Sequence, residues 1–257
     1  MQINGLLNSE DTLWNWKERI MAESVKRSVV LRLMGGVAIR EHCSQYYLLA
    51  DSCNRAHQDL DLAGYLNQVA DIQRLFLDLG FTENNNVMRL SGTERRIFYA
   101  PDAKIHVDVV LDKLFFCHTI DLRERLLVDF PTIPLADLLL SKLQIKQQTE
   151  KDMMDAMVLL LAHNIGYNDR ETINTKYIAT LTAGDWGLWK TVTDNLITIR
   201  DNINVYFTDT ERKENINSKI LLALREIEAE RKSLLWKLRN SIGNRIKWYN
   251  DVEELEN

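Results

Sequence analysis

The first half of the chain alternates between short apolar runs and segments with helical spacing. Residues 9–25 begin with capping residues and continue with apolar residues at helical intervals, which predicts a first helix. The apolar run at 29–33 ends at Gly35-Gly36, and helical spacing resumes over 37–53. This order predicts a strand, a glycine turn and a second helix.

The segment "DLDL" at residues 59–62 alternates two aspartates with two leucines, as a half-buried strand does. A helix is expected next, because the apolar residues of 66–79 fall on one helical face and Gly80 occupies the usual C-cap position. Pro101-Asp102 separates two alternating segments, which predicts a β-hairpin. In its second strand, His106 and Asp108 share one face.

From Leu135 onward the spacing is almost entirely helical. We therefore expect an α+β protein with two domains. Residues 1–130 would form an α/β domain with a mixed sheet, and residues 131–257 would form an all-α helical domain.

Composition narrows the functional classes. The 257 residues are 46% hydrophobic and carry a formal net charge of -5, which indicates a globular protein without general basicity. The three cysteines are too few and too irregularly spaced for a disulfide framework or a zinc site, so we expect free buried thiols. The N-terminal stretch has no long apolar segment. We expect a cytoplasmic protein that does not contact a membrane.

The carboxylates of the "DLDL" strand need a positive partner. Asp59 and Asp61 point to one face of the strand, while the leucines point to the core. Two unpaired carboxylates on a buried face would be unfavourable, and Mg²⁺ is a natural counter-ion because it prefers oxygen ligands. Asp108 supplies a third carboxylate, and Gly35-Gly36 would let backbone amides approach a triphosphate. We therefore expect two metal ions and a nucleotide in one cleft.

In this order, the glycine turn, the "DLDL" strand and the Val107-Asp108-Val109 strand resemble the signature of the nucleotidyltransferase superfamily typified by DNA polymerase β. Within it, the chain looks most like the AbiEii and MenT-type bacterial nucleotidyltransferases. Those proteins carry an arginine four residues before the first aspartate, as Arg55 stands here, and a later lysine followed by a K/R-D-x-x-D segment. The corresponding residues are Lys142, Lys151, Asp152 and Asp155.

The resemblance implies a reaction in which a nucleoside monophosphate is transferred from an NTP to an acceptor hydroxyl, with Mg²⁺ or Mn²⁺ as cofactor. The metal ligands would be Asp59, Asp61 and Asp108, and the last of these would also orient or deprotonate the acceptor. The nucleotide would contact Gly35, Gly36, Arg55, His57 and Lys142, and Asp152 would steer Lys142 or the acceptor. Two features depart from the family: the long gap between Gly36 and Asp59, and a histidine at position 57 where relatives have Ser or Thr.

Several alternatives stay open. The acceptor could be a tRNA 3′ end, as in toxin-type members, which would imply an antitoxin partner, or a protein hydroxyl, or a small molecule such as an aminoglycoside. A non-catalytic nucleotide-binding or antitoxin-like module on the same fold is the competing hypothesis. His57 and His106 are expected to contact metal ligands rather than the metal.

The C-terminal half adds two expectations. Residues 231–247 contain six lysines and arginines and no acidic residue, which would suit a solvated helix face or an RNA backbone. Their aliphatic residues, namely Leu234, Leu235, Leu238 and Ile242, are expected to face inward. Four tryptophans are expected to anchor the core of the helical domain: Trp186, Trp189, Trp236 and Trp248.

Overall fold

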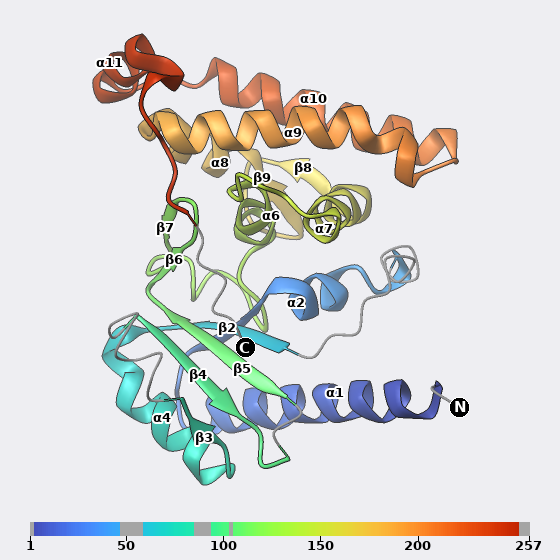
Figure 1. Ribbon diagram of the computed structural model, residues 1–257, viewed down its shortest axis with the longest axis vertical. Helices are drawn as coiled ribbons and strands as arrows, with labels where there is room; N and C mark the ends of the chain where they lie inside the picture. Colours follow the sequence, from blue (N-terminus) through green and yellow to red (C-terminus); the bar gives the residue numbers. More distant parts are fainter. Residues whose placement is uncertain (1–2, 47–58, 85–93, 103–104, 252–257) are drawn as a thin grey trace. The chain divides into compact units, whose positions relative to one another are not determined.

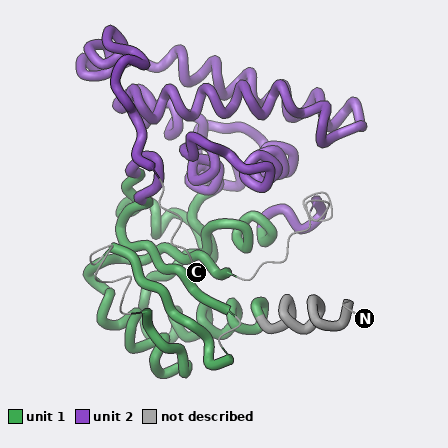
Figure 2. Tube along the Cα trace, viewed as in Figure 1, with its two compact units in different colours: residues 1–41, 54–114, 120–134 green, residues 42–53, 115–119, 135–257 purple. Residues whose placement is uncertain are grey.

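The computed structural model describes residues 3–46, 59–84, 94–102 and 105–251, with side chains from Leu13 onward. The chain forms two compact units (Figure 2). Unit 1 comprises residues 1–41, 54–114 and 120–134, and unit 2 comprises 42–53, 115–119 and 135–257. In the described part of the chain, no helix has both the length and the apolar character needed to cross a membrane.

Unit 1 is built on a mixed five-stranded sheet with the order β1-β2-β5-β4-β3 (Figure 1). The central pair, β2 and β5, is parallel, and the other neighbouring strands are antiparallel. The expected mixed sheet is therefore present, and so is the hairpin, formed by β4 and β5. The strands span β1 (Leu31–Met34), β2 (Asp59–Gly64), β3 (Thr82–Glu83), β4 (Arg95–Tyr99) and β5 (His106–Leu111).

The two faces of this sheet differ because side chains alternate along each strand. Leu60 and Leu62 of β2 are fully buried, as the alternation predicts, and Val107 of β5 lies on the same face as register partner of Leu60. On β4, Phe98 continues this face, and Phe76 of the covering helix stacks on its ring at 4.2 Å. The core of unit 1 therefore lies on the leucine face of the sheet.

Among the described residues of unit 1, three helices accompany this sheet: α1 (Ile3–Lys26), α2 (Gly35–His42) and α4 (Val69–Asp78). Helix α4 ends as its glycine predicts, since Gly80 adopts a φ of 89°. Helix α2 starts directly after β1, so the expected strand and helix are present, but Gly35 and Gly36 are the first residues of the helix rather than a separate turn. The helix ends at His42, and residues 47–53 of its expected span lie outside the described residues. Short 3₁₀ turns follow α2 at Ser44–Tyr46 and precede α4 at Leu66–Gln68.

Unit 2 is mainly helical. Its helices are α6 (Leu135–Leu143), α7 (Glu150–Ala162), α8 (Thr175–Gly184), α9 (Trp186–Tyr206), α10 (Thr210–Ala229) and α11 (Leu234–Ile242), followed by a 3₁₀ turn at Gly243–Arg245. Most begin at a side chain that accepts a hydrogen bond from a backbone N–H of the first turn. These caps are Thr149, Asn174, Asp185, Asp209 and Ser233.

The expectation that this half would be entirely helical is wrong. Strands β8 (Asn164–Gly166) and β9 (Thr172–Asn174) form a parallel ladder between α7 and α8. Each strand has only three residues, too few for a period to emerge in the sequence. A second two-stranded sheet, β6 (Lys113–Phe115) with β7 (Thr119–Asp121), lies where the chain passes from one unit to the other and back.

The orientation expected for the last helix is also wrong. Leu234, Leu235 and Leu238 of α11 are 79%, 76% and 67% exposed, and Ile242 is 40% exposed. The helix packs through Trp236 instead, whose ring meets the ring of Trp189 edge-on at 5.0 Å. The large aromatic side chain of Trp236 therefore determines which face of α11 packs against the rest of unit 2.

The tryptophans gather in this part of unit 2, as the sequence indicates. Trp186 and Trp236 are buried, while Trp189 and Trp248 are partly exposed. The ring of Trp186 lies within 6.1 Å of the ring of Trp189 and 6.0 Å of the ring of Trp248. The cluster joins α9, α11 and the segment that follows α11.

Candidate functional site

Two of the predicted site aspartates are direct neighbours in the sheet of unit 1. Asp61 on β2 and Asp108 on β5 are register partners in the parallel pair. Asp59 precedes Asp61 by two residues and is the register partner of His106. Because register partners point to the same side of a sheet, all three carboxylates lie on the face opposite Leu60 and Leu62.

The start of α2 lies against this carboxylate face. Gly35 has a φ of 65°, a conformation that other residues rarely adopt. A Cβ at Gly35 would lie only 2.9 Å from Cγ of Asp61 and would overlap its Oδ2 atom. The position therefore requires glycine for two reasons, its backbone conformation and the close approach of Asp61. Gly36 follows in the first turn of α2 and is partly exposed.

Asp108 is bound by an arginine. The Nε atom of Arg95 on β4 donates to both carboxylate oxygens of Asp108, at 3.0 Å and 2.9 Å, and its Nη2 atom donates to Oδ2 as well. The side chains are 32% and 15% exposed. The hydrogen bond to Asp108 raises the pKa of Arg95, burial opposes this, and the charges of Asp108 and Asp61 add to the increase.

Asp59 also has a partner on β5. Its Oδ1 atom lies 3.1 Å from Nδ1 of His106, and the Asp59 side chain is 53% exposed. The ring of Tyr99 on β4 lies 6.1 Å from the ring of His106. His106 therefore contacts a predicted metal ligand, as the sequence suggests.

The donor set of this face suits a hard divalent cation, because it consists of carboxylate oxygens beside a glycine that leaves room for close approach. The described residues nevertheless contain no group of three His, Cys, Asp or Glu side chains arranged to hold a metal ion. In the structure, the carboxylate of Asp108 pairs with Arg95 and that of Asp59 with His106. Metal binding at this face would exchange these contacts for metal–oxygen bonds.

Sequence reasoning missed Arg95. It lies in "RRIFY", the first strand of the predicted hairpin, and its partner is 13 residues away in sequence. The alternating pattern places Arg95 on the same face as Ile97, the register partner of Asp108. A pairing register for the hairpin would have been enough to suggest this contact.

The lysine and aspartates of the later motif form an ion-pair network in unit 2. Nζ of Lys142 on α6 lies 3.1 Å from Oδ1 of Asp152 and 3.0 Å from Oδ2 of Asp155 on α7. Asp155 is fully buried. Asp152 also caps α7, because its Oδ2 accepts from the backbone and hydroxyl of Thr149 at 3.2 Å and 2.8 Å. The charge of Lys142 is therefore balanced within its own unit.

The buried acid affects a neighbouring thiol. Burial raises the pKa of Cys43 to about 12, and the nearby charge of Asp155 adds to the increase. Cys43 and Cys117 are both free and buried, as expected. Cys53, Arg55 and His57 lie outside the described residues.

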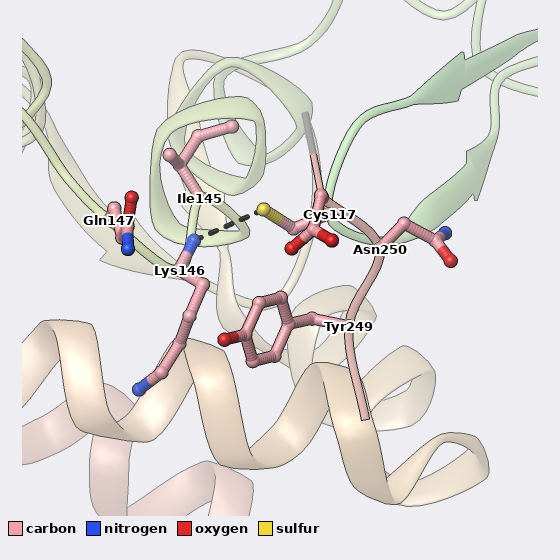
Figure 3. Close-up of a pocket in the computed structure, with 7 residues that line it drawn as sticks. Cys117, Ile145, Lys146, Gln147, Tyr249 and Asn250 are labelled. Carbon is pink, nitrogen blue, oxygen red and sulfur yellow. Dashed lines mark hydrogen bonds between the residues drawn. The ribbon is translucent and has the colours of Figure 1, made fainter. Parts of the chain in front are cut away.

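A cavity of about 210 Å³ lies beside Cys117 in unit 2 (Figure 3). The sulfur of Cys117 accepts a hydrogen bond from the backbone N–H of Lys146 at 3.3 Å, and its carbonyl accepts from the N–H of Asn250 at 3.0 Å. Tyr249 also lines the cavity. Cys117 thus connects three segments that are far apart in sequence.

The residue after it, His118, is 5% exposed. Its Nε2 atom lies 2.9 Å from Oγ1 of Thr191, which also accepts from the indole N–H of Trp248 at 3.1 Å. Burial lowers the pKa of His118, and the charge of Asp185 partly opposes the shift. The neutral imidazole is therefore the favoured form within unit 2.

Comparisons of the chain with family models, with curated proteins and with solved structures returned no match.

Proposed function

We propose that the protein is a metal-dependent nucleotidyltransferase that transfers a nucleoside monophosphate from an NTP to an acceptor hydroxyl. One observation carries the proposal: Asp61 and Asp108 are register partners on parallel strands, with Asp59 on the same face and Gly35 against Asp61. Three carboxylates on one face, beside a helix that begins with two glycines, suit a nucleotide held through divalent cations.

The proposed roles follow from this placement. Asp59, Asp61 and Asp108 would hold Mg²⁺ or Mn²⁺, which would supply charge neutralisation for the phosphates. Gly35 and Gly36 would allow backbone N–H groups to approach the triphosphate. Asp108 would orient the acceptor hydroxyl or accept its proton as the hydroxyl attacks the α-phosphate and pyrophosphate leaves.

We do not assign Lys142 a role in the proposed reaction. Its two carboxylate partners, Asp152 and Asp155, balance its charge, and one of them is fully buried. We therefore assign these three residues to the stability of unit 2 and base the reaction on the aspartates of unit 1. The acceptor classes remain a tRNA or other RNA end, a protein hydroxyl and a small molecule such as an aminoglycoside.

One observation favours a second candidate function, that of a non-catalytic nucleotide-binding module. Asp108 and Asp59 already bind the cationic or ionisable side chains Arg95 and His106. A non-catalytic nucleotide-binding module, for example an antitoxin-like protein, would retain these contacts permanently.

The test is incubation of the purified protein with each common NTP labelled in its α-phosphate, in the presence of Mg²⁺ or Mn²⁺. Total RNA, total protein and an aminoglycoside mixture serve as separate acceptors. We expect label in one acceptor class, lost in Asp61→Asn and in Asp59→Ala. The matched control is Asp71→Asn, which changes an exposed aspartate of α4.

Two outcomes would count against transferase activity. Label transfer that persists in both site variants would exclude the carboxylate face as the catalytic site. Nucleotide binding without transfer to any of the acceptor classes would favour the non-catalytic module.

A further inference from the structure

Arg95 and Arg96 are consecutive residues of β4 with opposite environments. Arg96 points to the leucine face of the sheet, where its side chain is 10% exposed and its Nε atom lies 3.5 Å from Oε1 of Glu83. Arg95 points to the carboxylate face, where its side chain is 32% exposed. Arg96 is therefore fixed in the interior of unit 1, whereas Arg95 reaches solvent at the candidate site.

Arg95 and helix α2 lie on opposite sides of the carboxylates. The strand order is β1-β2-β5-β4, and Gly35 of α2, which follows β1, lies against Asp61 of β2. On the other side, Arg95 of β4 binds Asp108 of β5. A phosphate chain over the two aspartates would therefore have the first N–H groups of α2 on one side and a guanidinium on the other. Both groups bind phosphate oxygens well, and a guanidinium can bind two of them at once.

Metal binding at Asp108 would weaken its contact with Arg95. Nε and Nη2 of Arg95 donate to both carboxylate oxygens of Asp108, which are the atoms that a divalent cation would use. The charge of Asp61 also acts on Arg95, and Asp61 is a second proposed metal ligand. The guanidinium would then stand beside a cation instead of a carboxylate. A phosphate oxygen held by the same cation would be its natural new partner.

We propose that Arg95 is a phosphate-binding residue that changes partner, from the carboxylate of Asp108 in the absence of metal to a phosphate of the nucleotide when a divalent cation binds Asp108. The inference rests on the proposed function, because it requires a nucleotide and a metal ion at the carboxylate face. The exchange keeps the guanidinium paired in both states, so metal and nucleotide each favour the binding of the other. Without metal, the pair with Asp108 withholds Arg95 from phosphate.

The first experiment measures the binding of inorganic triphosphate by isothermal titration calorimetry in metal-free buffer. Asp108→Asn leaves Arg95 without its carboxylate partner, so this variant should bind triphosphate roughly tenfold more tightly than the wild type. Asp59→Asn is the matched control, because it removes a carboxylate from the same face without releasing Arg95, and it should gain much less. The double variant Asp108→Asn, Arg95→Ala should lose the gain.

The second experiment repeats the titration at saturating Mn²⁺. The wild type should then bind triphosphate roughly tenfold more tightly than Arg95→Ala, because the metal at Asp108 has released the guanidinium. Arg95→Lys keeps the charge but cannot bind two oxygens in one plane, so its affinity should lie between the two. Arg74→Ala, on the exposed side of α4, should match the wild type.

Three results would overturn the inference: no gain in Asp108→Asn beyond that of Asp59→Asn, a gain that survives in the double variant, or equal affinities of wild type and Arg95→Ala in Mn²⁺. These results are separate from those of the labelling experiment. Triphosphate binding that depends on Arg95, without label transfer to any acceptor, would count against the transferase and support the inference. Label transfer by a protein whose triphosphate binding is independent of Arg95 would count against the inference alone.

Discussion

The guanidinium of Arg95 on β4 and the carboxylate of Asp108 on β5 form a bidentate ion pair on the carboxylate face of the unit 1 sheet. The pair places a fixed positive charge beside an oxygen ligand that the proposed reaction needs. The charge of Asp61 also acts on Arg95. Arg95 and a divalent cation would therefore compete for the same carboxylates.

Removal of this arginine should strengthen metal binding. We expect Arg95→Ala to bind Mn²⁺ roughly tenfold more tightly than the wild type, about 1.4 kcal/mol, because a competing cation is lost. Electron paramagnetic resonance titration of Mn²⁺ without nucleotide measures this directly. Arg74→Ala, on the exposed side of α4, is the control and should leave the affinity unchanged. Equal affinities for wild type and Arg95→Ala would contradict the competition.

The glycine at the start of α2 should tolerate no side chain. Gly35→Ala should lower the free energy of unfolding by about 2 kcal/mol or more, because alanine resists a positive φ and its Cβ would displace Asp61. Gly184→Ala is the control, since a Cβ there meets nothing within 4 Å. Urea unfolding of both variants tests the difference, and similar losses at the two glycines would argue against the close approach.

The ion-pair network of Lys142 should contribute to the stability of unit 2. Lys142→Met should lower the free energy of unfolding by about 3 kcal/mol, because it removes the cation beside the buried Asp155. The double variant Lys142→Met, Asp155→Leu should recover part of this loss, since the buried carboxylate of Asp155 is then removed together with its cation.

The exposed neighbour Lys151 provides the control for this network. Lys151→Met should change the free energy of unfolding by about 0.5 kcal/mol or less. A Lys142→Met variant as stable as Lys151→Met would show that Lys142 is free for another role, such as phosphate binding.

Lowering the pH should reduce the free energy of unfolding of unit 2, because His118 is buried there. Burial holds the pKa of His118 below its ordinary value of 6.5, so the unfolded chain binds a proton more readily than the folded chain. The resulting stability is present above pH 6.5 and is lost as the pH falls below it. His118→Gln should flatten this part of the stability profile, measured by urea unfolding between neutral and mildly acidic pH.

Some acid sensitivity should persist in that variant. Burial also lowers the pKa of His163. The informative quantity is therefore the difference between the pH profiles of wild type and His118→Gln, and identical profiles would exclude a contribution from His118.

Local sequence patterns were sufficient to predict much of the structure of unit 1. Alternation along β2 predicted that Leu60 and Leu62 are buried and that the two aspartates share the other face, because side-chain direction in a strand depends only on residue parity. The hairpin followed from its turn residues in the same way. These features need no knowledge of distant contacts.

Features that depend on distant contacts were not predictable. The contact between Arg95 and Asp108 requires the hairpin register. The contact of Lys142 with Asp152 agrees with the role that the family resemblance implied, but its second partner, Asp155, was not assigned to it. For α11, the spacing of leucines identified an apolar face, but Trp236 determined which face is buried. Amphipathic spacing tells which residues lie together on a helix, and it does not tell what they contact.

Residues 115–119 limit how the two units of the protein can be separated from each other. These residues belong to unit 2, yet the segments on either side, 54–114 and 120–134, belong to unit 1. The contacts of Cys117 and His118 would be lost from any fragment that begins at residue 135. A fragment cut at one pair of breakpoints would lack part of either unit, so both units have to be expressed together if these contacts are to be kept.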